Sequence, residues 1–444
     1  MALMARAAAS FRPHQEHVGF RVIPQDLAFV LQATPAWLVR AVCTEFRAAC
    51  APRPGYADDA VTSVERCAEA VDRCGMPPDH VVRAAARGGY VETLEWAYER
   101  DLEMGPAACQ AAAAGGHLEV LKWLRRHGCD ADLRTCCAAA ARGDVDMLEW
   151  ASHDGIALDG AMPHDPDVEP PTVASAAAAQ GHLTALRWAL AHGCRRDDAD
   201  ILMYAARGGH ERVVRWAFAH NIPALFLCTG AAQGGHRDIL EWACRQTPHP
   251  PWGDTCRAAA RAGHLDVLQW AVDHGCPLSD TTCRGAASGG HLEILEWARA
   301  RGAEWDVHTS EAAARHGRLK VLKWAYAHGC PIGAVTACAA VWSGRLDTLV
   351  WLHEVGCAWD SETCRAAAAL GRLDMLEFAR SHGCAWNAFL FNTPHQHSAT
   401  LEYAVEHGCP TDDYTCRLLL AYGRPDLAER VDARQRGLVG GGHA

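Results

Sequence analysis

The chain lacks any uninterrupted apolar run near the ~18 residues that a membrane-spanning helix requires. It also lacks a basic excess, because 42 Lys and Arg stand against 53 Asp and Glu, which gives a net charge of −11. These features argue against a membrane span and against nucleic-acid binding through a broad basic surface. The opening residues, MALMARAAASFR, have no long apolar stretch, so we expect no secretory signal. Their basic, acid-poor character leaves a transit peptide as the alternative.

Catalytic motifs are missing as well. The sequence contains no glycine-rich phosphate loop, no His-Glu-x-x-His and no nucleophile elbow. We therefore expect neither an enzyme nor a bound cofactor.

Cysteine and histidine are abundant, with 21 and 25 copies, which raises disulfides and zinc as hypotheses. Structural zinc sites need four ligands that converge on one metal. Here the word His-Gly-Cys recurs with one His and one Cys per copy, so a helix-end His and a small buried Cys explain it better. Without a secretion signal we expect a reducing compartment, the cytoplasm or alternatively the nucleus. We predict free thiols and no bound metal.

One sequence word is copied along most of the chain. The stretch AAAAGGHLEVLKWLRRHGC at 111–129 returns as AAARAGHLDVLQWAVDHGC at 258–276, and most successive copies lie 27 residues apart. The tryptophan of this word falls at Trp96, Trp123, Trp150, Trp188, Trp216, Trp242, Trp270, Trp297, Trp324 and Trp351. Phe378 and Tyr403 continue the row, so the unit occurs about 12 to 13 times. Arrays of this kind form solenoids, in which each unit packs against its neighbours.

Each unit contains two helical words. In TCRAAARAG, Thr255 before a run of small residues predicts a helix N-cap, and the glycine predicts the helix end. In HLDVLQWAVDHG, Leu265 and Leu268 belong to one apolar stripe, and Gly275 is the expected C-cap. Because neither helix can bury its apolar face alone, the units must stack.

These words resemble the ankyrin repeat. The likeness lies in A-A-x-x-G-H-L-[DE]-V-[LV] followed by x-G-[CA], and it covers about residues 80–435. Ankyrin repeats have a period of about 33 residues, and the residues missing here fall where those repeats carry their β-hairpin fingers. The resemblance, which is to the shortened, Trp-rich repeats abundant in giant DNA viruses, implies stacked helix pairs with short or missing fingers. The predicted fold class is an all-α solenoid of about 12–13 stacked helix-turn-helix repeats after a small N-terminal helical segment.

The N-terminal residues do not fit the repeat. Residues 22–50 resemble an F-box, a motif whose family docks on a Skp1-like subunit of a cullin ubiquitin ligase. The positions assigned to this contact are Ile23, Pro24, Leu27, Val30, Leu31, Leu38, Val42 and Phe46. The alternative is a helical cap for the stack. The expected organisation is a flexible N-terminus at 1–21, an F-box-like segment at 22–55, a connector or degenerate first repeat at 56–80, the solenoid at 81–435 with an insertion loop at 158–171, and a disordered tail at 436–444.

Two sets of side chains are candidates for recognition. The repeat tryptophans lie beside the apolar stripe of the second helix, so we interpret them as structural, with an aromatic recognition ladder as the alternative. Trp342 differs, because it lies two residues before Gly344 where other copies carry Arg, Gln, Ser or Ala. We predict that it faces outward as a contact hot spot.

Arginine is enriched on one face of the first helix. We number these positions backward from the glycine that follows the first helix, and positions −6 and −2 share a face because they are four residues apart. Both positions are rich in arginine across the repeats and include one acid, Glu311. The ankyrin resemblance implies that this face lines the concave side and binds a partner; the alternative is a role in solubility. The candidate groove residues are Arg87, Arg207, Arg257, Arg261, Arg284, Arg315 and Trp342.

The sequence thus predicts a monomeric protein–protein interaction scaffold, without a nucleic-acid or membrane partner. Its target would carry an acidic or phosphorylated segment, because guanidinium groups pair with carboxylate and phosphate. With the F-box resemblance, the scaffold becomes a substrate-binding adaptor for a Skp1/cullin-type ubiquitin ligase. The alternative is a plain ankyrin-repeat binding protein with no ubiquitin link.

Overall fold

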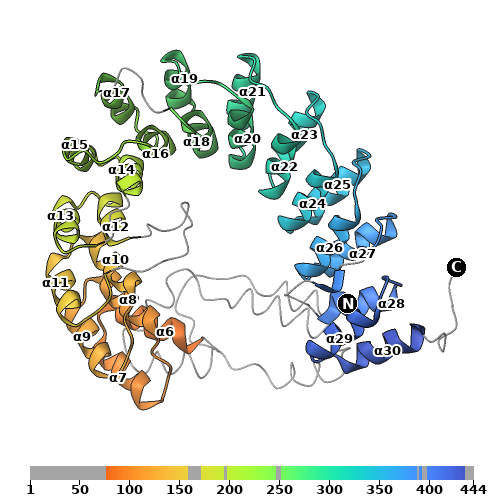
Figure 1. The fold of residues 1–444 in the computed structure, drawn as a ribbon, viewed down its shortest axis with the longest axis horizontal. Coiled ribbons are helices and arrows are strands. Elements are labelled where there is room, and N and C mark those ends of the chain that lie inside the picture. The colour runs from red at the N-terminus through yellow and green to blue at the C-terminus, as the bar shows by residue number, and fades with distance from the viewer. Residues whose placement is uncertain are drawn as a thin grey trace, which may run out of the picture. The chain divides into compact units, whose positions relative to one another are not determined.

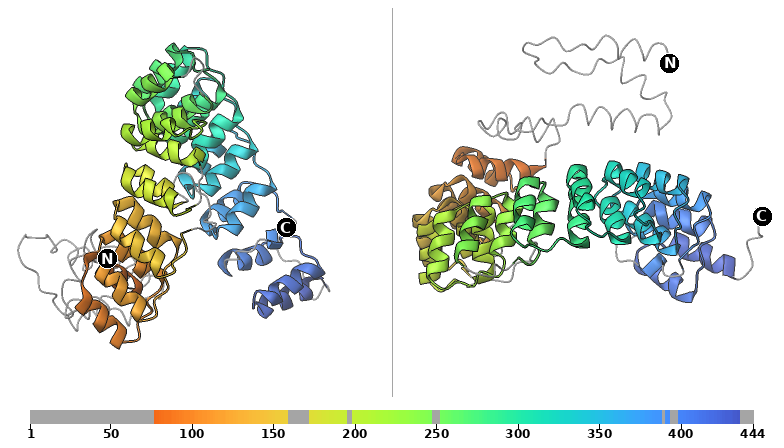
Figure 2. Two further views of the ribbon diagram at one scale, coloured as in Figure 1. Left: turned by 60° about the vertical axis from the view of Figure 1, so that its left-hand side comes forward. Right: turned by 90° about the horizontal axis from the view of Figure 1, so that it is seen from above.

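The computed structural model describes residues 77–158, 172–194, 198–246, 252–387, 390–392 and 398–435. These residues form twenty-five α-helices, numbered α6 to α30, and one short 3-10 helix, η1, and they contain no β-strand (Figures 1 and 2). The predicted all-α repeat fold is therefore confirmed, and no β-hairpin fingers occur in this part of the chain. The F-box-like segment and all eight of its contact positions lie outside the described residues, and so does the insertion from residue 159 to 171.

The chain divides into two compact units. Within the described residues, the first unit holds most of the helix pair α6 (Pro78–Gly88) and α7 (Val91–Glu99). Val82 of α6 and Leu94 of α7 are buried.

The second unit is a series of helix pairs that repeat along the chain. Its first helices are α8 (Pro106–Gly115), α10 (Leu133–Arg142), α12 (Val173–Ala179), α14 (Asp198–Arg207), α16 (Leu227–Gly234), α18 (Thr255–Ala262), α20 (Asp280–Gly289), α22 (Val307–Arg315), α24 (Ala334–Trp342), α26 (Ser361–Ala369) and α29 (Asp413–Ala421). Its second helices are α9 (Leu118–Arg126), α11 (Val145–His153), α13 (Leu183–Ala191), α15 (Glu211–Ala219), α17 (Arg237–Gln246), α19 (Leu265–Asp273), α21 (Leu292–Ala300), α23 (Leu319–Ala327), α25 (Leu346–Glu354), α27 (Leu373–Ser381), α28 (Ser398–Glu406) and α30 (Pro425–Gln435). One pair has η1 (Leu390–Asn392) in place of a first helix.

The first helices begin differently from the sequence prediction. In several units the N-cap is the residue three positions before the threonine, as with Asp306 before Thr309 and Asp360 before Thr363. The Asp306 carboxylate accepts a hydrogen bond from the backbone N–H of His308. Thr309 and Thr363 then lie fully buried in the first turn. An aspartate is the stronger N-cap, so the helix extends outward and the threonine packs inside.

The second helices end as a left-handed glycine turn requires. Helix α19 ends with His274 as its C-cap residue, and Gly275 follows with φ of +94°. The backbone N–H of Cys276 then donates to the carbonyl oxygen of Ala271 at 2.9 Å. Gly275, which the sequence predicted as the C-cap, therefore stands one position after the observed cap, where a residue without a Cβ adopts positive φ without strain.

The stack is held together chiefly through its first helices, each of which contacts the first helix of the next repeat from α8 to α26. Small residues permit this close approach. A Cβ added to Gly230 of α16 would lie only 2.3 Å from the carbonyl oxygen of Met203 in α14. The histidine before a second helix bridges neighbouring repeats, since Nε2 of His236 donates to the carbonyl oxygen of Arg207 at 3.2 Å. The alanine-rich word thus determines the spacing of the stack, and Gly-His adds a hydrogen bond between repeats.

Candidate protein-binding groove

Five consecutive first helices, α14 to α22, present their −6 and −2 side chains to two pockets that adjoin each other. The α16 pocket, about 510 Å³, is lined by residues of α14, α16 and α18, among which Arg257 and Arg261 also line the second pocket. That second pocket, the α20 pocket, is about 310 Å³ and is lined by residues of α18, α20 and α22. The −6 and −2 pairs in chain order are Met203 and Arg207, Thr229 and Gln233, Arg257 and Arg261, Arg284 and Ser288, and Glu311 and Arg315. All ten of these residues line one or both pockets.

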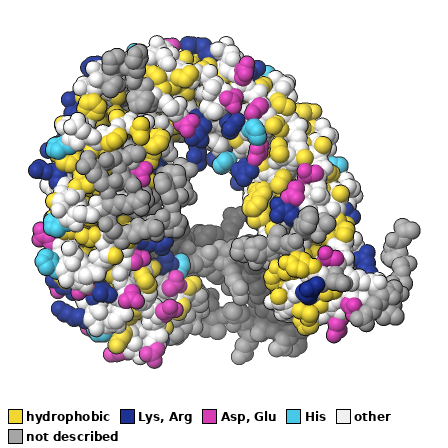
Figure 3. All heavy atoms as spheres, viewed as in Figure 1, with side chains coloured by type: hydrophobic (Ala, Val, Ile, Leu, Met, Phe, Trp, Pro, Cys, Tyr) yellow, Lys and Arg dark blue, Asp and Glu magenta, His cyan; other side chains and the backbone are white. Residues whose placement is uncertain are grey.

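Positive side chains outnumber acids in this groove. The α20 pocket is lined by Arg257, Arg261, Arg284 and Arg315 against one acid, Glu311, and His308 and His316 also line it. Figure 3 shows Lys and Arg side chains, with His and acidic side chains among them, over α18, α20 and α22. On a chain with a net charge of −11, this groove is a local reversal of sign. Such a reversal favours anionic segments of a partner.

The arginines are nevertheless paired within the chain. Arg257 contacts Asp254 at 2.8 Å, and Arg284 contacts Asp280 at 2.9 Å and Asp306 at 3.6 Å. The repeat pattern did not point to these acids, because they lie at or just before the start of the helix, outside positions −6 and −2. Because these acids at the starts of helices neutralise part of the arginine charge, the effective charge of the groove is smaller than the count of arginines indicates.

Glu311 joins this network from inside the groove. Arg315 donates to its carboxylate at 2.7 Å, and Nδ1 of His308 lies 3.0 Å from its other oxygen. Partial burial acts to raise the pKa of Glu311, but these two hydrogen bonds outweigh it and hold the pKa below its ordinary value. The Glu311 carboxylate therefore already accepts hydrogen bonds from two side chains that line the α20 pocket, Arg315 and His308.

Each pocket also contains a buried polar atom without a hydrogen-bond partner among the described residues. These atoms are Nε of Arg284 in the α20 pocket and Oγ1 of Thr229 in the α16 pocket. A buried donor left without a partner costs about 1–3 kcal/mol. Because both atoms are buried, a ligand or a water molecule reaches them only if a neighbouring side chain moves.

The α16 pocket has an apolar side. Met203 and Phe226 line it, and the Phe226 side chain is 46% exposed. Leu225, the preceding residue, is 60% exposed. Two large apolar side chains held in water beside a pocket are typical of a contact surface.

Two of the predicted groove residues lie outside both pockets. Trp342 is 51% exposed near the end of α24, the next first helix after α22, so its predicted outward orientation is confirmed. Arg87 is exposed in the last turn of α6 and lines neither pocket. The structure thus brings Arg207, Arg257, Arg261, Arg284 and Arg315 together and leaves these two apart from them.

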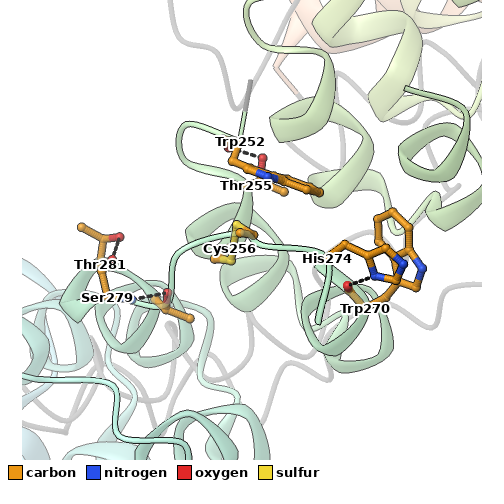
Figure 4. Close-up of a disulfide and its surroundings, with 9 residues drawn as sticks. Trp252, Thr255, Cys256, Trp270, His274, Ser279 and Thr281 are labelled. Atoms are coloured by element: carbon orange, nitrogen blue, oxygen red, sulfur yellow. Dashed lines mark hydrogen bonds between the residues drawn. A yellow bond between two sulfur atoms is a disulfide. The ribbon is translucent and has the colours of Figure 1, made fainter. Parts of the chain in front are cut away.

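The repeat tryptophans pack against the histidines at the ends of their helices. The ring of His274 stacks on Trp270 with centroids 4.1 Å apart, and its Nδ1 donates to the Trp270 carbonyl oxygen at 2.8 Å (Figure 4). The same arrangement recurs at Trp123 and His127. Each histidine is thus occupied by its own helix end, which favours the structural interpretation of both residue types.

The cysteines of the first helix and of the turn after the second helix meet within one repeat. Cys256 and Cys276, twenty residues apart, form a disulfide between the start of α18 and the turn after α19 (Figure 4). In the equivalent pair, Cys109 and Cys129 are hydrogen-bonded thiols 3.2 Å apart. The expectation of free thiols is therefore wrong for Cys256 and Cys276, because the folded helix pair brings the two positions together. Among the other cysteines, Cys228, Cys283 and Cys330 carry free thiols.

Neither a candidate metal site nor a candidate membrane span occurs in the described part of the chain. It contains no group of three or more His, Cys, Asp or Glu side chains placed to hold a metal ion. None of its helices is both long and apolar enough to cross a bilayer.

Several groove residues were not predicted from the sequence. Met203, Thr229, Gln233, Ser288 and Glu311 share the −6 and −2 positions with the arginines, so the repeat register alone identifies them. The candidate list contained the arginines and Trp342, so these five residues at the same positions were not in it. Phe226 precedes its helix, and nothing in the repeat pattern marks it.

Comparison with models of known protein families gave no match, and neither did comparison with curated protein sequences. Among solved structures, the chain is similar to the crystal structure of the human ASB11 ankyrin repeat domain, at 19% sequence identity. The alignment covers 38% of this chain and 84% of that chain, with a TM-score of 0.28. The fold assignment therefore comes from the chain's own helix pairs, which repeat without strands throughout the described residues.

Proposed function

We propose that this chain is an ankyrin-type scaffold that binds a partner protein through the groove of the α16 and α20 pockets. The observation that carries the proposal is that the −6 and −2 side chains of five consecutive first helices line two adjoining pockets. In a repeat array these positions vary while the framework stays constant, so they are where specificity resides. The excess of arginine among them favours an acidic or phosphorylated segment.

The test is a charge reversal with a matched control. The groove variant carries Arg257→Glu, Arg261→Glu and Arg284→Glu. The control carries Arg83→Glu, Arg365→Glu and Arg417→Glu, which reverse the same number of charges at position −6, the position of Arg257 and Arg284, outside both pockets. Proteins captured by the wild type are then purified, and their association is measured directly against both variants over a range of salt concentrations.

Binding through the groove predicts slower association for the groove variant and a weaker salt dependence, because charges of this kind act mainly on the rate of encounter. The control variant should bind as the wild type does. Trp342→Ala should speed dissociation if an apolar side chain of the partner contacts it. A partner that binds both triple variants equally well would place the binding surface elsewhere on the chain.

We also propose the finer role of an adaptor for a Skp1/cullin-type ubiquitin ligase, on the F-box resemblance of residues 22–50. Pro24→Ala together with Leu27→Ala should abolish association with a Skp1 homologue while target binding by the repeats persists. If the wild type binds no Skp1 homologue at micromolar concentration, the plain scaffold is the better description.

A further inference from the structure

We infer that the α20 pocket receives a phosphoserine of the partner, and that the α16 pocket receives an apolar side chain about five or six residues away along the same segment. This inference rests on the proposed function and specifies the chemistry of its ligand. It comes from the different linings of the two adjoining pockets.

The charges of the α20 pocket favour a dianion over a carboxylate. Arg257, Arg284 and Arg315 each already contact a carboxylate of the chain. A carboxylate from a partner would exchange one such contact for another with little gain. A phosphoryl group carries a charge of about −1.5 to −2 near neutral pH and offers three acceptor oxygens.

The donors of this pocket come from three different helices. Arg261 lies on α18, Arg284 on α20 and Arg315 on α22, and all three line the same space. The buried Nε of Arg284 has no hydrogen-bond partner among the described residues. Donors that converge from three sides match the oxygens of a tetrahedral phosphoryl group better than the two coplanar oxygens of a carboxylate. Ser288 also lines the pocket, but its hydroxyl already donates to the carbonyl oxygen of Gly285 at 2.8 Å, so the arginines are the donors that matter here.

The separation of the two pockets sets the spacing of the two partner side chains. The α16 pocket centres on a first helix two repeats before the one at the centre of the α20 pocket. Packed helices lie about 8–10 Å apart, so the two centres are separated by about 16–20 Å. An extended chain advances about 3.3 Å per residue, which corresponds to five or six residues. Met203 and Phe226, which line the α16 pocket, make it suitable for a Leu, Met or Phe side chain.

The experiment uses degenerate peptide libraries on the full chain. One library fixes a central phosphoserine, and matched libraries fix Ser or Glu at that position. A second series fixes Leu at each position on both sides of the phosphoserine. Binding is measured by fluorescence anisotropy, and inositol phosphates serve as small-anion competitors.

We expect the phosphoserine library to bind at least about tenfold more tightly than the Glu library. The best Leu position should fall five or six residues from the phosphoserine on one side. Arg284→Gln should reduce the affinity about tenfold, and Phe226→Ala should remove the preference for Leu without changing the preference for phosphate. Arg417→Gln, at the same repeat position as Arg284 but outside both pockets, should leave binding unchanged.

Glu311→Gln separates ligand binding from a structural role of the network. It removes the carboxylate that competes for Arg315 and His308. The phosphoserine library should then bind several-fold more tightly, whereas a purely structural network would be weakened by the same change. Circular dichroism confirms that each variant folds.

The outcomes that overturn the inference differ from those that overturn the proposed function. Equal binding of the Glu and phosphoserine libraries, or tighter binding of inositol phosphates than of any peptide, would refute the phosphoserine site and leave the scaffold proposal intact. A Leu preference at no position would refute the two-pocket spacing. A purified partner that binds the charge-reversed groove variant as it binds the wild type would remove the scaffold proposal and this inference together.

Discussion

Replacing Gly230 with alanine should destabilise the stack, although alanine is the better helix former. Gly230 lies within α16, where an isolated helix would gain about 1 kcal/mol from the change. In the folded chain, however, the new Cβ would lie 2.3 Å from the carbonyl oxygen of Met203. Side-chain Cβ atoms do not approach closer than 3.0 Å, so α14 and α16 must separate locally by about 0.7 Å, the difference between 3.0 and 2.3.

The expected net loss is about 2 kcal/mol. Overpacking of a close-packed site costs about 3 kcal/mol at the upper end of its usual range, and backbone atoms give way less readily than a side chain. Subtracting the gain of about 1 kcal/mol in helix propensity leaves this figure, which corresponds to about a 30-fold change in the ratio of folded to unfolded chains. In a solenoid the loss should concentrate at one interface between repeats.

The assay is urea unfolding followed by circular dichroism, together with hydrogen exchange of α14 and α16. Gly105→Ala is the control, because an added Cβ there meets no atom within 4 Å and the backbone φ of −82° is negative. We expect the control to change the stability by less than about 1 kcal/mol. If Gly230→Ala leaves the protein as stable as the wild type or makes it more stable, α14 and α16 are not packed closely enough for this clash.

Three further predictions concern the cysteines and the groove. Burial raises the pKa of the Cys228 thiol to about 12, and only the thiolate reacts with a maleimide. At pH 8 Cys228 should therefore react about a thousandfold more slowly in native protein than in unfolded protein. Equal rates in peptide mapping would contradict the burial. Non-reducing mass spectrometry should find Cys256 joined to Cys276. Cys256→Ser should lower the free energy of unfolding by about 3 kcal/mol, because the unfolded chain then regains the entropy lost by closing a loop of this length. An unlinked pair would restore the expectation of free thiols there. Because the folded-state pKa of Glu311 is depressed, its contribution to stability is present above the ordinary glutamate pKa and is lost as the pH falls from about 5 to about 3. The stability difference between wild type and Glu311→Gln should therefore shrink over that window, and a difference independent of pH would show that the carboxylate is not paired.

The local architecture of each repeat could be predicted from the sequence because it depends on short-range rules. The runs of alanine, the glycine after each helix and the spacing of leucine and tryptophan all act within a few residues of one another. They predicted the two helices per unit, whereas the expectation of short or missing fingers came from the ankyrin resemblance and the 27-residue period. Buried Leu268 and half-buried Trp324 lie where the pattern places them. The helix starts were less accurate, since an aspartate three residues upstream competes with the threonine for the N-cap.

The register of the groove was also determined by the sequence, because every repeat stacks on the last in the same orientation. Residues at the same position of successive units must therefore form a row, and the repeat register by itself selects Arg257, Arg261, Arg284 and Arg315. The sequence shows that Glu311 belongs to this row, but not that its carboxylate pairs with Arg315, because pairing depends on side-chain conformation.

Only the tertiary structure decided which parts of the row form a site. Whether neighbouring side chains enclose a pocket depends on the distance between helices and on the rotamers of long side chains, neither of which a repeat pattern contains. The pairing of Arg284 with Asp306 crosses from one repeat to the next, and so does the hydrogen bond between His236 and Arg207. The approach of Cys256 to Cys276 likewise arises only when two helices fold against each other. Contacts between residues twenty or more positions apart follow from packing, and packing is what the repeated word leaves undetermined.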